Sequence, residues 1–434
     1  MEVEKMKMRK ILTTVLAGGI LAGGLAGCSG GNTIKTKGEV KPEINYSSVS
    51  EGSYPSFEEG EAAKGYNEYA MKLFAIVAAA EDKNTNVMVS PASVMFALDL
   101  ADSGACKNTL AEINKAIGGA DLTPEQQQAF ASKWMKSINS SEGVDFSVAN
   151  AIWSNRELMG DNMSDEYKNY VKKLFDAEVR SMKFDGGAIK DINGWVNDKT
   201  KGMIDKILDE LDPATAAVLV NAIAFDGKWA VPYEDYQISN DKFKGISGES
   251  DATFLEEKSD LYYESDKAIG FSKLYEGGEY MFVAILPKDE AVDANKFMSE
   301  FTGEDLNMFM NSASSGYEVY SKIPKFKNDY TTSLVPALRN LGINDAFDPE
   351  KADFTGIANL ENNLYISNVL HKTFIEVDEN GTKASAVTAI EVECAGIMPE
   401  EKEIRYVYCD RPFAYMIVDR NDMTPVFVGT VNNI

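Results

Sequence analysis

The chain has 434 residues, 44% hydrophobic and 26% charged, which are ordinary values for a folded globular protein. Its formal net charge is −25, so we expect no nucleic-acid partner, because phosphate binding requires a basic surface. The four cysteines form no CxxC pair and no cluster with histidine. We therefore expect no metal site, no disulfide framework and no cofactor.

The first 27 residues have the layout of a secretory signal. Basic residues at 5–10 precede an apolar stretch at 11–27, which ends in small residues before Cys28. The stretch is short and glycine-rich for a permanent transmembrane helix. Leu25-Ala26-Gly27-Cys28 resembles the bacterial lipobox, in which cleavage precedes a cysteine that carries a lipid. We expect residues 1–27 to be removed and Cys28 to be lipidated; the alternative is a simple signal peptide with an incidental cysteine.

Residues 28–59 are expected to form a lipidated tether. They are rich in Gly, Ser, Lys, Glu and Pro and contain few large apolar side chains, so they cannot bury a core. A lipid followed by a tether would hold the folded part, residues 60–434, outside the cell at the outer side of the bacterial membrane.

Helical and extended patterns alternate through the folded part. Apolar residues recur at helical spacing over 66–80, and Ser90-Pro91 predicts an N-cap and the first residue of a second helix. Further helices are predicted at 109–117, 124–138, 164–175 and 188–199. Strands are predicted at 146–153, 216–225, 279–287, 317–323, 364–370, 373–378, 413–419 and 425–431. This order indicates a single α+β domain.

The residues of common catalytic sites are missing. The chain has one histidine, His371, at the end of an apolar strand, whereas a Ser-His-Asp enzyme needs its histidine in a cleft. There is no G-x-S-x-G turn, H-E-x-x-H helix or phosphate-binding glycine loop. We interpret His371 as a hydrogen-bonded core residue and expect no enzyme activity.

Residues 379–396 form an unusual alternating segment after the predicted strand at 373–378. Positions 382, 384, 386, 388, 390, 392 and 394 carry small or apolar residues, whereas most of the intervening ones are polar. Small side chains allow a strand to enter between existing strands without steric cost. The simpler interpretation is an ordinary strand of an antiparallel sheet.

The segment resembles the hinge and reactive loop of serpins, in which an acid, any residue, Gly and Thr precede a run of small residues. The hinge would comprise Glu379, Gly381, Thr382, Ala384, Ser385 and Ala386. Other blocks resembling this family follow in its order: 86–98 with Ser90-Pro91, Asn221-Ala222 to Trp229, Ile323-Pro324-Lys325-Phe326, Leu341-Gly342 to Phe347, Arg411-Pro412-Phe413 and 425–429.

The resemblance implies the serpin fold, with about nine helices around three β-sheets and an exposed reactive-centre loop. Such proteins trap a serine protease as an acyl complex when the cleaved loop inserts into the central sheet. The resemblance also implies a polar cluster that controls sheet opening, formed by Ser90, Ser93, Asn221 and His371. Trp229 and Lys325 match positions where the loop first enters the sheet, and Lys325 is expected to pair with Glu379.

Counting along the family pattern places the reactive bond between Ala395 and Gly396. A pocket that accepts alanine is elastase-like or subtilisin-like, so we expect a monomeric inhibitor of such proteases. The stretch from Gly396 to Pro412 is longer than usual, and cleavage after Lys402 or Arg405 would give substrate behaviour instead. A cysteine at position 394, beside the bond, is unusual. Three interpretations stay open: a small inward-facing residue, a free thiol that oxidises, or a disulfide with Cys409.

Two alternatives stay open at this level. One is a non-inhibitory serpin that serves as a surface binding module. The other is a solute-binding lipoprotein, which would also need a lipid anchor. This alternative predicts two doubly wound α/β lobes.

Overall fold

Several helices begin where the sequence supplies capping side chains, and two of these also have proline in the first turn. The Ser90 hydroxyl accepts a hydrogen bond from the Ser93 amide and precedes α2 (Pro91–Asp102), which confirms the predicted N-cap. Thr123 and Gln126 form a reciprocal capping box at the start of α4 (Pro124–Asn139). In both helices proline occupies the first turn, where it removes no helical hydrogen bond.

The computed structural model describes residues 55–118, 122–141, 143–160, 163–215, 217–259, 261–358, 364–382 and 402–434. All of them belong to one compact unit. Besides α2 and α4, the helices in these ranges are α1 (Glu59–Ala80), α3 (Lys107–Ile117), α5 (Arg156–Met159), α6 (Asp165–Phe175), α7 (Gly186–Lys199), α8 (Ala294–Ser299), α9 (Gly303–Asn311) and α10 (Val335–Asn340). Together with three sheets they confirm the predicted α+β class.

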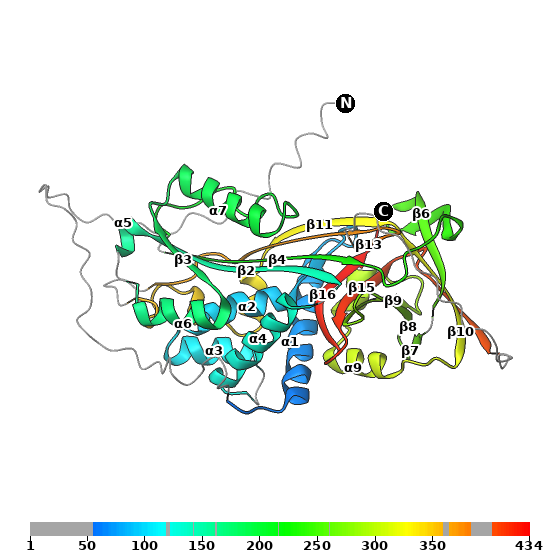
Figure 1. Ribbon diagram of the computed structural model, residues 1–434, viewed down its shortest axis with the longest axis horizontal. Helices are drawn as coiled ribbons and strands as arrows, with labels where there is room; N and C mark the ends of the chain where they lie inside the picture. Colours follow the sequence, from blue (N-terminus) through cyan, green and yellow to red (C-terminus); the bar gives the residue numbers. More distant parts are fainter. Residues whose placement is uncertain are drawn as a thin grey trace, which may run out of the picture. The chain divides into compact units, whose positions relative to one another are not determined.

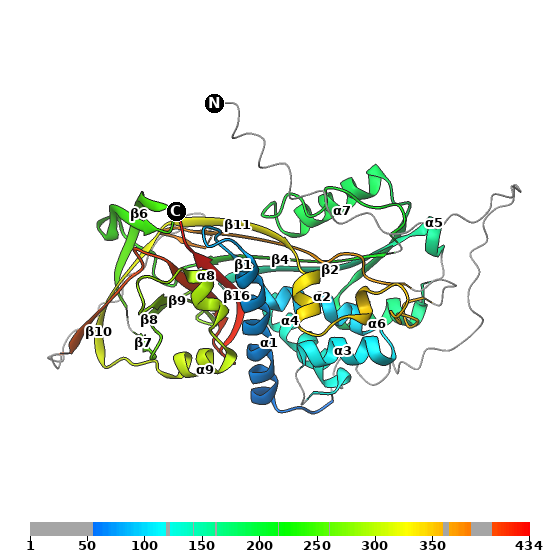
Figure 2. The same cartoon turned by 180° about the vertical axis from the view of Figure 1, so that it is seen from behind.

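The first sheet forms the centre of the core. Every residue of β9, β15 and β16 is buried, and most of these residues are apolar; the polar exceptions are Asp419, Thr424 and Thr430. Helices α1 and α8 pack beside it (Figure 2). Its order is β1 (Met88–Val89), β16 (Thr424–Val431), β15 (Phe413–Asp419), β9 (Tyr280–Pro287), β8 (Ala268–Leu274) and β7 (Tyr262–Glu264).

The second sheet has one buried and one solvent-facing side. Its order is β14 (Glu403–Tyr408), β10 (Tyr317–Pro324), β6 (Gly248–Ser259) and β5 (Ile238–Gly245). Strand β14 runs parallel to β10 at the edge of the sheet. It contains six residues of the long stretch after Gly396, including Arg405, which is ion-paired with Glu403.

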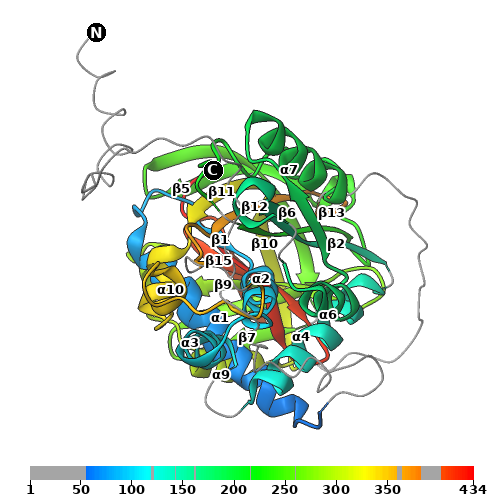
Figure 3. The ribbon, with the colours of Figure 1, turned by 90° about the vertical axis from the view of Figure 1, so that its left-hand side faces the viewer.

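The third sheet positions the candidate site. Helix α7 lies on one of its faces, and α2, α4 and α6 lie on the other (Figures 1 and 3). Its strands β4 and β12 run in the same direction, because both pair antiparallel with β13 between them. Its order is β11 (Phe326–Ser333), β12 (Leu370–Val377), β13 (Gly381–Thr382), β4 (Ala217–Lys228), β2 (Val144–Asn155) and β3 (Glu178–Met182).

The predicted strand at 364–370 is wrong: residues 364–369 have no regular structure, and β12 begins at Leu370. Asn368 explains where the strand starts. Its side-chain oxygen accepts hydrogen bonds from the Val369 amide and the Ser333 hydroxyl, and such local bonds compete with sheet pairing.

The helices of the described ranges are too short or too polar to cross a lipid bilayer. None of them combines the length and the apolar character that spanning a membrane requires.

Candidate functional site

A tight turn connects β12 to β13. The Asp378 carboxylate accepts hydrogen bonds from the Asn380 amide (2.7 Å) and the Gly381 amide (3.2 Å). The Asp378 amide donates to the Gly381 carbonyl across the turn (2.9 Å). Asparagine and glycine favour such turns, so the predicted turn chemistry at 378–381 is present.

The two residues after this turn already lie inside the third sheet. Gly381 pairs with Lys228 and Thr382 with Gly227 on one side, and Thr382 pairs with Val377 on the other. A side chain at position 381 would collide with the Gly227 carbonyl and lie 2.8 Å from the Lys228 Cα, so only glycine fits. Thr382 is buried, and its hydroxyl is hydrogen-bonded to that of Tyr275 (2.7 Å).

Trp229 and Tyr233 hold the turn from the β4 side. The Trp229 indole donates to the Asp378 carbonyl (2.9 Å), and its backbone amide donates to the Asn380 carbonyl (2.9 Å). The Tyr233 amide donates to the Glu379 carbonyl (2.9 Å). Trp229 is also stacked on Tyr275, with ring centroids 4.7 Å apart. The residue expected where the loop enters the sheet therefore contacts the turn directly.

Lys325 and Glu379 form an ion pair at the same end of the sheet. Lys325 follows β10 and precedes β11, so it lies at the junction of the second and third sheets. Its hydrogen bond lowers the pKa of the Glu379 carboxyl. Both side chains are partly exposed, so we expect the pair to fix the position of the turn more than to stabilise the fold.

Three of the four residues expected in the polar cluster meet between α2, β12 and β16. The Ser90 amide donates to His371 Nε2 (3.0 Å), and the Ser90 hydroxyl donates to the Val426 carbonyl (2.9 Å). Ser93 donates its amide to the Ser90 hydroxyl. Burial lowers the pKa of His371 to about 4, so the imidazole is neutral and accepts a hydrogen bond. Asn221 lies in β4 opposite Asn150.

A cavity of about 220 Å³ extends from this cluster between the first residues of β4 and of β12. The segment 200–215, which follows α7 and is called the post-α7 segment below, contributes much of its lining. Among the described residues, β4 and β12 are joined only through β13 at their opposite ends. The cavity is lined by Ser93, Val94, Ala97, Ile207, Leu208, Glu210, Leu211, Asp212, Thr215, Ala217, Val218, Val220, Leu334, Ser367, Asn368, Val369 and His371.

Several predicted residues lie outside the described residues. These are the small hinge residues, the reactive bond, the cysteine beside it and the lipidation site: Ala384, Ser385, Ala386, Ala395, Gly396, Cys394 and Cys28. Cys409 is described and is a fully buried free thiol, whose pKa burial raises strongly. The side chain of Asn221 is likewise not among those described.

Sequence patterns did not reveal the aromatic and ionic residues beneath the turn. Lys273 and Glu257 form a nearly buried ion pair, and the Lys273 ammonium lies 4.1 Å from the centre of the Tyr233 ring. These residues come from β8, β6 and the chain after β4. No local spacing connects them, so a single sequence carries no signal for this group.

Comparisons with known proteins agree with this geometry. The family model described as serpin (serine protease inhibitor) matches residues 64–434. The chain is 30% identical to an uncharacterized serpin-like protein of Thermococcus kodakarensis, over 90% of this chain and 91% of that protein. It is 32% identical to human serpin B8, over 83% and 96%. It also matches the crystal structure of the thermophilic serpin tengpin in its native state, with a TM-score of 0.79, 36% identity and coverage of 88% and 96%.

The fold and the turn at 378–382 thus define a class of proteins in which the chain after a tight turn enters a central sheet between two parallel strands. The chain belongs to the serpin family. Serpins are generally protease inhibitors and are mostly not catalytic enzymes.

Proposed function

We propose that this serpin is an inhibitor that traps elastase-like or subtilisin-like serine proteases by inserting its cleaved loop into the third sheet. The observation that carries the proposal is the position of Gly381 and Thr382 between β4 and β12. Continued in the same direction, the chain would run toward the cavity. Its small residues Ala384, Ser385 and Ala386 would enter first.

The register of the existing pairs predicts where each inserted residue would lie. Thr382 is opposite Gly227 and Val377, so Thr388 would lie opposite Asn221 on one side and His371 on the other. The hydroxyl of Thr388 would then join the polar cluster. Backbone pairing on both sides and burial of apolar residues would provide the driving force.

The length of β4 supports cleavage near Ala395. By the same register, Val392 would lie opposite Ala217, the first residue of β4. Cleavage after Ala395 would therefore give an inserted strand that fills the gap. Cleavage after Arg405 would require part of β14 to leave the second sheet, where Arg405 contacts Tyr317 and Glu403.

We also propose that the protein is secreted and held at the outer side of the cell membrane by a lipid on Cys28. The lipobox-like sequence and the polar composition of residues 29–58 support this. Labelling with a radioactive or alkyne-tagged fatty acid would test it. A Cys28→Ser variant that is labelled as well as the wild type would contradict the proposal.

The inhibitory proposal is tested by incubating the protein with pancreatic elastase and with subtilisin. We expect a complex that survives a denaturing gel, and mass spectrometry should place the cut after Ala395. Clean cleavage without a complex for both proteases would support a non-inhibitory role. A complex with a cut elsewhere than 394–396 would refute the assigned bond alone.

A further inference from the structure

Two aspartates are buried one turn apart on α2. Asp99 and Asp102 are 0% and 1% exposed, although carboxylates are almost never fully buried unless they are paired. They are three residues apart on the helix, so their Cβ atoms lie about 5–6 Å from each other. We call Asp99 and Asp102 the aspartate pair.

The helices around the aspartate pair supply few hydrogen-bond donors. Asp102 Oδ2 accepts a hydrogen bond from the Gln128 side-chain amide (2.7 Å), and Gln128 accepts one from the Tyr170 hydroxyl on α6 (2.5 Å). The other three carboxyl oxygens have no hydrogen bond of normal geometry to any described residue, although the Gln127 side chain lies near Asp99. A buried carboxylate without donors is strongly destabilised.

The titratable groups that face the aspartate pair are acidic. Tyr69 on α1 faces Asp99, and Glu125 on α4 faces Asp102. From α6, the Tyr167 hydroxyl donates to the Leu100 carbonyl (2.8 Å). Helix α3 and the strands β2, β4 and β16 also pack against α2. No lysine, arginine or histidine of the described ranges is among the groups that act on either carboxyl.

A proton can provide the missing positive charge. Burial raises the pKa of both carboxyls, and that of Asp102 reaches about 7. A protonated carboxyl also gains a hydroxyl donor, which a neighbouring carboxylate can accept. Since the folded-state pKa is above the unfolded one, the stabilisation by the proton is complete below pH 3.8. For Asp102 it is lost as the pH rises to about 7.

Helix α2 connects the aspartate pair to the gap in the third sheet. Ser93, Val94 and Ala97 of this helix line the cavity between β4 and β12, and Asp99 follows Ala97 by two residues. Packed helices transmit displacements because they are rigid elements. Looser packing around Asp99 and Asp102 would therefore also change the wall of the cavity.

We propose that the aspartate pair is a proton-binding site whose deprotonation loosens α2 from α1 and α4 and makes the gap between β4 and β12 easier to open. The effect on the gap rests on the proposed inhibitory function, whereas the proton site does not. The inhibitor would then insert its loop faster in mildly alkaline solution than in mildly acidic solution.

The first test uses an Asp99→Asn/Asp102→Asn variant, which preserves side-chain shape and cannot ionise. Relative to wild type, its melting temperature should rise by about 6 °C between pH 4.5 and pH 7.5, because only the wild type loses a bound proton. Asp191→Asn/Asp198→Asn is the matched control, since it removes the same charge from exposed positions of α7. The control should follow the wild type, and a pair variant that also follows it would overturn the inference.

Infrared spectroscopy gives a readout that is independent of stability. At pH 6 the native wild-type protein should show the band of a protonated carboxyl, and Asp102→Asn should weaken this band. If the double variant does not fold, this measurement decides the question. A wild-type spectrum without the band at pH 6 would refute the proton site.

A divalent cation is the other possible counter-charge for the aspartate pair. Calcium or manganese chloride added at pH 7.5 distinguishes it from a proton. An increase in the melting temperature of the wild type that the pair variant does not show would overturn the assignment to a proton. Equal responses of the two proteins support it.

Pancreatic elastase tests the effect on the gap. The ratio of the wild-type rate constant of inhibition to that of the pair variant should rise about fivefold between pH 6 and pH 8.5. Taking the ratio removes the pH dependence of the protease itself. A constant ratio would overturn the link to the gap. If the wild type forms no complex at either pH, the proposed function fails, and the melting and infrared results still decide the proton site.

Discussion

At the scale of single residues, His371 couples the polar cluster to pH. It is the chain's single histidine, and burial lowers its pKa to about 4 from the ordinary value of 6.5. Its folded-state pKa lies below its unfolded one, so its contribution to stability is complete above pH 6.5 and is lost as the pH falls toward 4. Protonation would also remove the acceptor of the Ser90 amide.

We therefore expect His371→Gln to remove part of the acid sensitivity. Relative to wild type, the variant's free energy of unfolding should increase by about 3 kcal/mol between pH 7 and pH 4. Urea titrations at several pH values measure this difference, and values at pH 7.5 provide the baseline. Parallel stability curves for the two proteins would show that His371 is not the group responsible.

Stability must be compared between wild type and variant because the titration of Asp102 changes the free energy of unfolding with pH in the opposite direction. Asp102 is buried on α2, accepts a hydrogen bond from the Gln128 amide (2.7 Å), and has its pKa raised by burial to about 7. Its contribution to stability is complete below pH 3.8 and is lost as the pH rises to 7. The wild-type curve alone would combine both effects.

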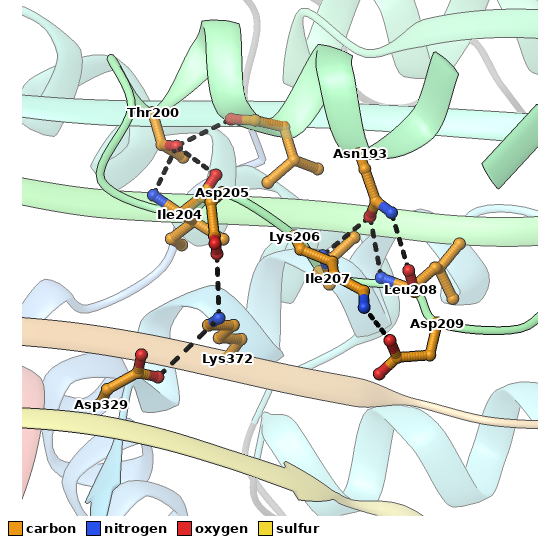
Figure 4. A network of polar contacts seen from close by, with 11 residues as sticks. Asn193, Thr200, Ile204, Asp205, Lys206, Ile207, Leu208, Asp209, Asp329 and Lys372 are labelled. Carbon is orange, nitrogen blue, oxygen red and sulfur yellow. Dashed lines mark hydrogen bonds and ion pairs between the residues drawn. The ribbon is translucent and has the colours of Figure 1, made fainter. Parts of the chain in front are cut away.

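At the scale of elements, the post-α7 segment is tied to both α7 and β12 (Figure 4). Asn193 on α7 accepts hydrogen bonds from the amides of Ile207 and Leu208 and donates to the Leu208 carbonyl. Asp205 forms an ion pair with Lys372 on β12 (3.2 Å), and Lys372 also faces Asp329 on β11 (3.9 Å). A strand inserted between β4 and β12 would have to displace part of this segment.

Asp205→Asn should loosen the segment and accelerate loop insertion. The carboxylate is largely exposed, so the pair is weak, and we expect about a two- to fivefold change in the rate of insertion. Stopped-flow fluorescence of a dye-labelled loop in the presence of elastase would follow insertion. Asp209→Asn is the matched control, because Asp209 is equally exposed and pairs with Lys206 inside the same segment. Equal rates in all three proteins would contradict this role.

Features with local rules could be predicted from the sequence at this scale. These features depend only on residues that are neighbours in the sequence. The structure contains the cap at Ser90, the turn at Asp378 and the helices over 124–138 and 188–199. Several strands were not predicted, because distant partners decide whether they pair. These are the longer strands β5, β6, β8 and β11 and short or edge strands such as β7 and β14. The same reason explains why Tyr275 and Lys273 could not be assigned to the site from sequence.

At the scale of the whole molecule, the proposed insertion of the loop between β4 and β12 predicts a native state that is less stable than the loop-inserted one. Nicking residues 383–401 with thermolysin, a metalloprotease that forms no acyl intermediate, would release the loop without trapping. We expect the melting temperature to rise by about 10 °C or more, since about 5 kcal/mol of added pairing shifts it by roughly 2 °C per kcal/mol.

Thr382→Arg is the control for this measurement. A bulky charge at a buried position next to Tyr275 should prevent the loop from inserting, so cleavage should leave the melting temperature unchanged. If cleavage does not raise the melting temperature of the wild-type protein, the result contradicts loop insertion.

The two-residue strand β13 has a kinetic consequence. A new strand normally begins with an unfavourable nucleation step, because chain entropy is lost before pairing compensates for it. Here Thr382 is already paired on both sides, and Gly381 is paired with β4. Strand pairing would then only have to propagate from this nucleus, one residue pair after another. The rate of trapping would then be set by how fast β4 and β12 separate, and a substitution that expels Thr382 would restore the nucleation delay.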